Sequence, residues 1–349
     1  MGKQSEQSFK IVDFLRFPLI MVVVLIHCNY PATGLTEVQN SAPIFYTIQQ
    51  FLQHHIYTVA VPLFFFISGY LFFRNGIPDY IDLKRKLIRR LQTLLIPYIL
   101  WNTIGMCVFL LKTSHYFVNY FPQYADLDLS ILYLIKGFIA VPNTKFPYDL
   151  SLWFLRNLII IIGITPLLCI AFKKMRILAL LIPIVLICFV PSFCYGLSFD
   201  LFYFMIGGVF SIINYDLCDF IKKVKWISLI TWIILIICTI YISNEIFYLL
   251  CVLAGIFASL YVGLLCIERN YKIPCLLTKS TFFIYAFHAL FISFMTKICL
   301  NILPTNNEFN AIISYLFLFL NLSGGSILVF YIFNRLFPKL TSILTGKRS

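Results

Sequence analysis

Apolar segments of about the length needed to cross a bilayer recur throughout this sequence. A membrane-spanning helix needs about 20 predominantly apolar residues. Ten stretches meet this requirement, at residues 11–30, 55–73, 91–111, 152–172, 177–194, 198–215, 226–243, 246–266, 280–300 and 311–334. Of the 349 residues, 61% are hydrophobic and 12% are charged, whereas soluble domains average about 45–50% and 25%. The sequence therefore predicts an all-α polytopic membrane protein, with residues 1–349 forming a single membrane domain.

The distribution of positive charges predicts the membrane topology of these segments. If the N-terminus is cytoplasmic, all but five of the 27 lysines and arginines fall on the cytoplasmic side. This asymmetry follows the positive-inside rule, and one missed helix would invert every later loop. We therefore expect ten spans in the inner (plasma) membrane, with both termini in the cytoplasm. The net charge of +13 is interpreted as a topology signal, and no nucleic-acid partner is expected.

The first apolar segment contains two residues that are costly in hydrocarbon, Arg16 and His27. Ionisable groups inside a membrane usually face the protein interior or a water-filled cavity, and they indicate function. Their spacing of eleven residues is about 20° past three helical turns, so both lie on one face, roughly 16 Å apart along the axis. One helix face is therefore predicted to present a fixed cation near one membrane surface and an imidazole beyond the midplane. Two simpler interpretations stay open: Arg16 extends to the lipid head groups, and His27 bonds a neighbouring helix.

Other residue types show no pattern of a metal site or a serine nucleophile. The eleven cysteines lie mostly in apolar runs, without a CxxC pair, and are interpreted as small buried hydrophobes. No metal is expected. Ser68 and Gly69 are predicted to serve helix packing, since Ser68 lacks the G-x-S-x-G context of a nucleophile elbow.

Several motifs, in order along the chain, resemble the acyltransferase-3 family of integral-membrane acyltransferases. The first is Arg16 followed by ten residues and His27. The others are VPLFFFISGYLFF (61–73), RRLQTLLIPY (89–98), SLWFLRNL (151–158) and FFIYAFHALF (282–291). One departure is that Lys86 and Arg89 stand where the family often has Arg-x-x-Arg, and a lysine lacks the planar bidentate fork of an arginine.

This resemblance implies transfer of an acyl group, usually acetyl, from cytoplasmic acetyl-CoA to a hydroxyl of an extracytoplasmic glycan or related acceptor. Acetyl-CoA would be a donor substrate, and no bound cofactor is expected. The phosphates of such a donor call for cations at the inner face, which Arg16, Arg85, Arg89 and Arg90 are predicted to supply. His27 is predicted to take the proton of the acceptor hydroxyl and return it to the leaving thiolate. A covalent acyl-imidazole intermediate stays open.

The remaining candidates for the acceptor pocket belong to the fourth and ninth segments. His288 and Tyr285 lie near mid-membrane, and His288 is predicted to serve the pocket or to partner His27; a purely structural interhelical hydrogen bond is the alternative. Arg156, Trp153 and Asp149 are at the outer entry of the fourth segment. Simpler interpretations stay open for these three residues. Trp153 and Arg156 would lie at the membrane interface, with the arginine extended towards water. Asp149 would be a loop carboxylate exposed to solvent.

A transporter or flippase that exports a polysaccharide or lipid-linked sugar is the competing function. Such proteins also carry intramembrane cations and histidines. They commonly consist of two related halves with matching broken helices, and no such symmetry is evident between the first five and last five segments.

Overall fold

The computed structural model describes residues 6–28, 38–120, 129–141, 144, 146–190, 196–213, 215–242 and 244–347. Every regular element within these ranges is helical, and they contain no strand. The α-helices are α1 (Glu6–His27), α3 (Pro43–Phe51), α4 (Ala60–Phe72), α5 (Tyr80–Arg90), α6 (Ile96–Thr113), α7 (Ile131–Lys136), α8 (Trp153–Gly163), α9 (Thr165–Met175), α10 (Leu181–Phe189), α11 (Leu197–Ile212), α12 (Leu217–Tyr241), α13 (Glu245–Glu268), α14 (Cys275–Ile302), α15 (Glu308–Leu336) and α16 (Pro338–Leu344).

Short segments of tighter or wider helix join several of these elements. Two are π-helical, η1 (Leu52–Ile56) and η3 (Leu91–Leu95). Four are 3₁₀-helical, η2 (Tyr57–Val59), η4 (Val118–Tyr120), η6 (Leu150–Leu152) and η7 (Arg176–Leu180). Single π-helical turns within longer helices often occur at functional sites, and η3 adjoins the cavity described below.

Six helical segments in the described part of the chain are long and apolar enough to cross a membrane. They are Pro43–Phe72, Tyr80–Thr113, Leu217–Tyr241, Glu245–Glu268, Cys275–Ile302 and Glu308–Leu336. A pair bent by 56°, Leu150–Gly163 with Thr165–Phe189, forms a seventh if it is one broken span. The expectation of an all-helical membrane protein is thus confirmed for the described residues, whereas the count of ten spans and the orientation stay predictions.

The fourth and fifth expected segments fall on this bent pair, whose break at residue 164 lies inside the fourth. The first and sixth expected segments are also not among the six spans, for evident reasons. Helix α1 covers the first segment but carries four charged side chains, those of Glu6, Lys10, Asp13 and Arg16. Helix α11 covers the sixth segment with only 16 residues. Both helices are packed inside the protein over much of their length, so neither depends on lipid contact alone.

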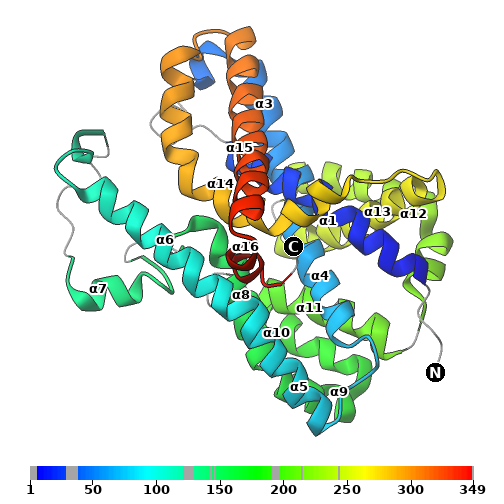
Figure 1. Cartoon of the computed structure of the whole chain (residues 1–349). Coiled ribbons are helices and arrows are strands. Elements are labelled where there is room, and N and C mark those ends of the chain that lie inside the picture. The colour runs from blue at the N-terminus through cyan, green and yellow to red at the C-terminus, as the bar shows by residue number, and fades with distance from the viewer. Residues whose placement is uncertain are drawn as a thin grey trace.

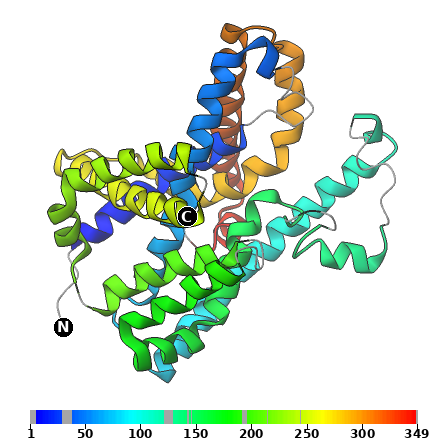
Figure 2. The same cartoon turned by 180° about the vertical axis from the view of Figure 1, so that it is seen from behind.

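Helix α1 runs from the side of the molecule near the N-terminus to the middle, where the groups of helices meet (Figures 1 and 2). It contacts α4, α12, α13, α14 and α15. Its buried face includes Ile11, Leu15 and Val24. Leu15 packs so closely on α13 that a Cβ added to Gly263 would lie 3.0 Å from it. The position of α1, and of every side chain that it presents, is therefore set by several neighbours at once.

Helices α4 and α11 approach each other through a reciprocal pair of glycines. A Cβ at Gly69 would lie 1.9 Å from the carbonyl oxygen of Phe204, and one at Gly207 would lie 2.0 Å from that of Phe66. Small residues permit such backbone contact between membrane helices. The packing role predicted for Gly69 is therefore confirmed, and this contact fixes α4 as one wall of the site.

Candidate active site

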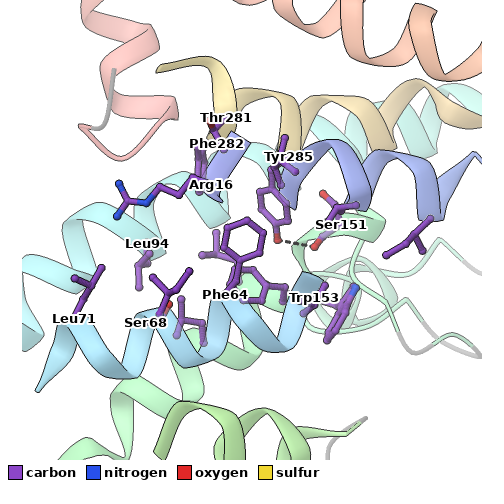
Figure 3. Close-up of a pocket in the computed structure, with 18 of the residues that line it drawn as sticks. Arg16, Phe64, Ser68, Leu71, Leu94, Ser151, Trp153, Thr281, Phe282 and Tyr285 are labelled. Atoms are coloured by element: carbon purple, nitrogen blue, oxygen red, sulfur yellow. Dashed lines mark hydrogen bonds between the residues drawn. The ribbon is translucent and has the colours of Figure 1, made fainter. Parts of the chain in front are cut away.

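A cavity of about 290 Å³ lies between α1, α4, α8, α14 and the junction of α5 with η3. Figure 3 shows Arg16, Leu71 and Leu94 at one end of it, and Ser151 and Trp153 at the other. Because its walls come from helices far apart in the sequence, only the assembled bundle creates this space.

Arg16 and His27 both line this cavity. The helical spacing predicted that they share one face of α1, and the geometry agrees with that prediction. His27 is half-buried, in the last turn of α1. The catalytic roles of the two residues stay predictions.

The end of the cavity near Arg16 gathers positive charge. The guanidinium of Arg16 forms an ion pair with Asp13, with a separation of 2.8 Å between Nη1 and Oδ1. Arg90 also lines the cavity, and it is close enough for its charge to interact with that of Arg16. Lys279, at the start of α14, is a third lining cation. Three cations and one paired carboxylate leave this end with an excess of positive charge that suits an anionic ligand.

The other basic residues of α5 lie outside the cavity. Arg85 and Arg89 are exposed, and Arg85 pairs with Asp82 at 3.0 Å. Lys86, which departs from the family motif, donates from Nζ to the carbonyl oxygen of Phe72 at 2.6 Å. Lys86 thus anchors the end of α4, and of the basic residues on α5 only Arg90 faces the cavity.

His27 and His288 lie next to each other, with ring centroids 5.3 Å apart and ring planes at 44°. His288 is fully buried. Its Nδ1 lies 2.8 Å from the carbonyl oxygen of Ile284. Since a carbonyl only accepts, Nδ1 carries the proton when the ring is neutral, and Nε2 has a lone pair. This Nε2 is buried and has no hydrogen-bond partner among the described residues.

The turn of α1 that carries His27 is held by two side chains from other helices. Gln53 of η1 donates from Nε2 to the carbonyl oxygen of Ile26 at 3.0 Å. Tyr315 of α15 donates its hydroxyl to the carbonyl oxygen of Leu25 at 3.3 Å. The last carbonyls of a helix lack partners within it, so these bonds satisfy the helix end and fix its position. Sequence reasoning missed both residues, because no local pattern indicates them.

Tyr285 and Trp153, two of the predicted pocket residues, line the cavity together with Ser151. The hydroxyl of Tyr285 donates to the carbonyl oxygen of Ser151 at 2.6 Å (Figure 3). This bond joins α14 to η6 beside the cavity. Ser68 also lines it, so the prediction that Ser68 serves packing alone is incomplete.

Arg156 lies behind the cavity wall and does not line it. Its side chain is only 6% exposed. It donates from Nη1 to the carbonyl oxygen of Ile139 at 2.9 Å and from Nε to Oδ1 of Asn157 at 3.0 Å. Asn157 in turn donates to Asp200 of α11 at 2.7 Å. Arg156 therefore connects α8 to the segment before η6 and, through Asn157, to α11.

Asp149 is fully buried, so the expectation of a solvated loop carboxylate is wrong. Its Oδ1 accepts from the backbone N and the hydroxyl of Ser151, at 3.1 and 2.8 Å. Burial raises the pKa of Asp149 to about 8, although the bonds from Ser151 act in the opposite direction. The backbone N of Asp149 donates to Asn102 of α6 at 3.3 Å. The residue thus ties the start of η6 to α6, next to the cavity wall.

Lys279 is a cation at the Arg16 end of the cavity that sequence reasoning did not identify as a functional candidate. It directly precedes the ninth apolar segment, on the side predicted to be cytoplasmic like Arg16. That placement was a usable signal, but many lysines share it. Among the described residues, no group of three histidine, cysteine or acidic side chains could hold a metal ion.

Comparison with known proteins connects this site to a family. No solved structure matches the chain. The succinoglycan biosynthesis protein ExoH of Rhizobium meliloti (strain 1021) is 27% identical over 174 residues, which cover 49% of this chain and 45% of ExoH. The chain thus spans less than half the length of that relative. Residues 9–335 match the Acyltransferase domain family, acyltransferase-3, and the chain therefore belongs to this family.

Proposed function

We propose that this protein transfers a short neutral acyl group, acetyl, from cytoplasmic acyl-CoA to a hydroxyl of an extracytoplasmic glycan. The observation that carries the proposal is one cavity with a cluster of cations at one end and His27 at the other, with the ring of His27 beside that of the buried His288. Membership of an acyltransferase family supports the reaction class. A relative named for succinoglycan biosynthesis supports a glycan as the acceptor.

The cationic end suits the phosphates of coenzyme A. Arg16, Arg90 and Lys279 line it, and arginine forks match phosphate oxygens well. Arg85 and Arg89, exposed on the same helix as Arg90, would contact parts of the carrier that stay outside the cavity. In this arrangement the cationic end faces the cytoplasm of a plasma-membrane protein, as the positive-inside rule requires.

The middle of the cavity favours a neutral acyl group. Its lining there is apolar and includes Ile20, Val23, Phe64, Phe154 and Leu158. Among the described lining residues, the only cationic side chains are Arg16, Arg90 and Lys279. A dicarboxylic acyl group would bring its free carboxylate into this apolar part, where desolvation of an unpaired charge is costly. Acetyl avoids that cost.

The chemical step uses His27 as the general base. It removes the proton of the acceptor hydroxyl as the oxygen attacks the thioester carbonyl. The carbon–sulfur bond then breaks, and the protonated His27 returns the proton to the leaving thiolate. Direct transfer needs one base, whereas the acyl-imidazole route needs a second one for the acceptor, so we favour direct transfer.

His288 acts as a positioning residue for His27. With its Nδ1 proton committed to Ile284, its buried Nε2 can only accept. An N–H of His27 directed at this atom would orient the ring and leave the other nitrogen of His27 free as the base. In a buried site such a hydrogen bond also satisfies an atom that is otherwise unpaired.

Reconstituted protein tests this function. Proteoliposomes would receive labelled acetyl-CoA on the Arg16 side and a glycan with free hydroxyls on the other side. We expect release of free coenzyme A that matches the label gained by the glycan. Glycan movement without consumption of the thioester would instead support the transporter and overturn the proposal. Cys107→Ala, an exposed cysteine in α6, is a control expected to keep full activity.

A further inference from the structure

A second cavity, of about 640 Å³, lies between α12 and α13. Tyr215, Asp219, Trp226, Tyr261 and Glu268 are among the residues that line it. It shares no lining residue with the first cavity. The acyl-transfer proposal therefore gives it no role.

A break within α12 shapes this cavity. Lys225 has φ +26° and ψ −120°, and the helix changes course at that residue. Residues with a side chain rarely adopt a positive φ, and kinks of this kind have local causes and consequences. The hydroxyl of Ser228 donates to the carbonyl oxygen of Lys225 at 2.7 Å, which satisfies a group that the kink frees. The kinked residue Lys225 is itself one of the residues that line the cavity.

Charges of both signs line the cavity, and the charge of Asp219 interacts with that of Lys223. Lys222, Lys223 and Lys225 face it together with Asp219 and Glu268. Within the described chain, no ion pair joins any of these lysines to either carboxylate. Lys222 instead donates to Gln7 at 3.2 Å, and Lys223 lies over the ring of Tyr215. A ligand that carries an anion and a cation a few ångströms apart would complement this lining.

The surroundings place the cavity at the membrane interface. Trp226 is 61% exposed and contacts Tyr261 edge to face, with centroids 5.6 Å apart. Tryptophan and tyrosine concentrate at the level of lipid head groups. Beyond Trp226, the exposed side chains of Ile227, Ile230 and Ile234 continue along α12 at a depth suited to acyl chains. A phospholipid is therefore the abundant ligand that fits both the charges and the apolar stripe.

We propose that this cavity binds the head group of an aminophospholipid of the phosphatidylethanolamine type. The lysines hold the phosphate, since ammonium groups are strong donors to phosphate oxygens. Asp219 and Glu268 accept hydrogen bonds from the primary ammonium. A choline head group has no N–H to donate, and a glycerol head group has no cation, so both satisfy only the lysine half of the site.

Native mass spectrometry of the purified, delipidated full chain tests the proposal with three lipids of identical acyl chains. We expect phosphatidylethanolamine to be retained about threefold more than phosphatidylcholine or phosphatidylglycerol, the scale of a partly exposed ion pair. The double variant Asp219→Asn with Glu268→Gln should lose this preference and gain phosphatidylglycerol. Lys222→Gln with Lys225→Gln should weaken retention of all three lipids, because each carries the phosphate.

Matched controls separate binding from general damage. Lys272→Gln and Glu245→Gln change exposed charges outside the cavity and should leave the lipid ratios unchanged. Circular dichroism would confirm that each variant is folded. Equal retention of the three lipids by the wild type, or an unchanged ratio in the carboxylate variant, would overturn the proposal. This readout does not involve acyl transfer, so it is independent of the proposed reaction.

Discussion

The two ends of the main cavity are built on different principles. The cationic end draws Arg16, Arg90 and Lys279 from three helices, and Arg16 and Lys279 are exposed. The other end depends on one half-buried imidazole beside one fully buried imidazole. Long-range charge is shared among several groups, whereas a proton transfer needs one atom at one position. We therefore expect a substitution at the cationic end to reduce activity in part, and a substitution at the histidine end to reduce it severely.

The largest expected effect is that of His27→Ala. Loss of a general base lowers kcat by roughly 10²- to 10⁴-fold. Coenzyme A release in proteoliposomes measures it, and binding of acetyl-CoA should persist because the cations are intact. Retained turnover would show that His27 is not the general base. It would also contradict the view that one imidazole carries the chemical step at that end of the cavity.

His288→Leu should be next, with kcat reduced by roughly 10- to 100-fold and KM for acetyl-CoA unchanged. The physical reason is loss of the acceptor that orients His27. His288→Gln retains an acceptor oxygen and should recover part of the rate. If both variants lose activity equally while their melting temperatures fall together, His288 is structural only. The pH profile of kcat should move in His288→Leu but not in a variant of the cationic end.

Arg90→Gln should raise KM for acetyl-CoA about tenfold with little change in kcat, because it removes ground-state attraction. The remaining attraction should weaken further with added salt. Lys84→Gln, exposed on the same helix and outside the cavity, serves as the control. A fall in kcat at constant KM would contradict the assignment of donor binding to the cationic end and of proton transfer to the histidine end.

Gln53→Ala tests whether the end of α1 must be held. Loss of one partly buried hydrogen bond, worth about 1 kcal/mol, should lower kcat about fivefold, with KM for acetyl-CoA unchanged. Gln50→Ala, on the same helical segment, is the matched control. Identical rates for the two variants would show that the bond to Ile26 does not position His27.

Stability, rather than rate, should respond at Asp149, because its raised pKa links the free energy of unfolding to pH. A buried carboxyl that ionises at about pH 8 in the folded protein, but near 4 when unfolded, stabilises the fold fully only below pH 4. That stability is lost as the pH rises towards 8. The melting temperature should therefore fall between pH 5 and 8, and Asp149→Asn should flatten this slope. An unchanged slope would show that Asp149 is ionised in the fold.

Features local to one helix could be predicted from the sequence. The helical period alone placed Arg16 and His27 on one face of the first segment, and both residues line the cavity. Apolar patterning also predicted the helical membrane fold, and ordered motifs predicted the family. The sequence could not show which arginine of α5 lines the cavity, because Arg85, Arg89 and Arg90 were all candidates for binding the donor. Packing next to the π-helical η3 selects Arg90.

The sequence by itself determined that the fold is helical and membrane-spanning, and that Arg16 and His27 share one helix face. It could do so because each of these depends on residues within a few turns of one another. Only the tertiary structure decided that His288 lies beside His27, that Lys279 joins the cations, and that Asp149 and Arg156 lie buried behind the wall. Those relations join residues from distant helices, and they depend on how close-packed side chains and glycine contacts such as Gly69 with Phe204 set helix against helix.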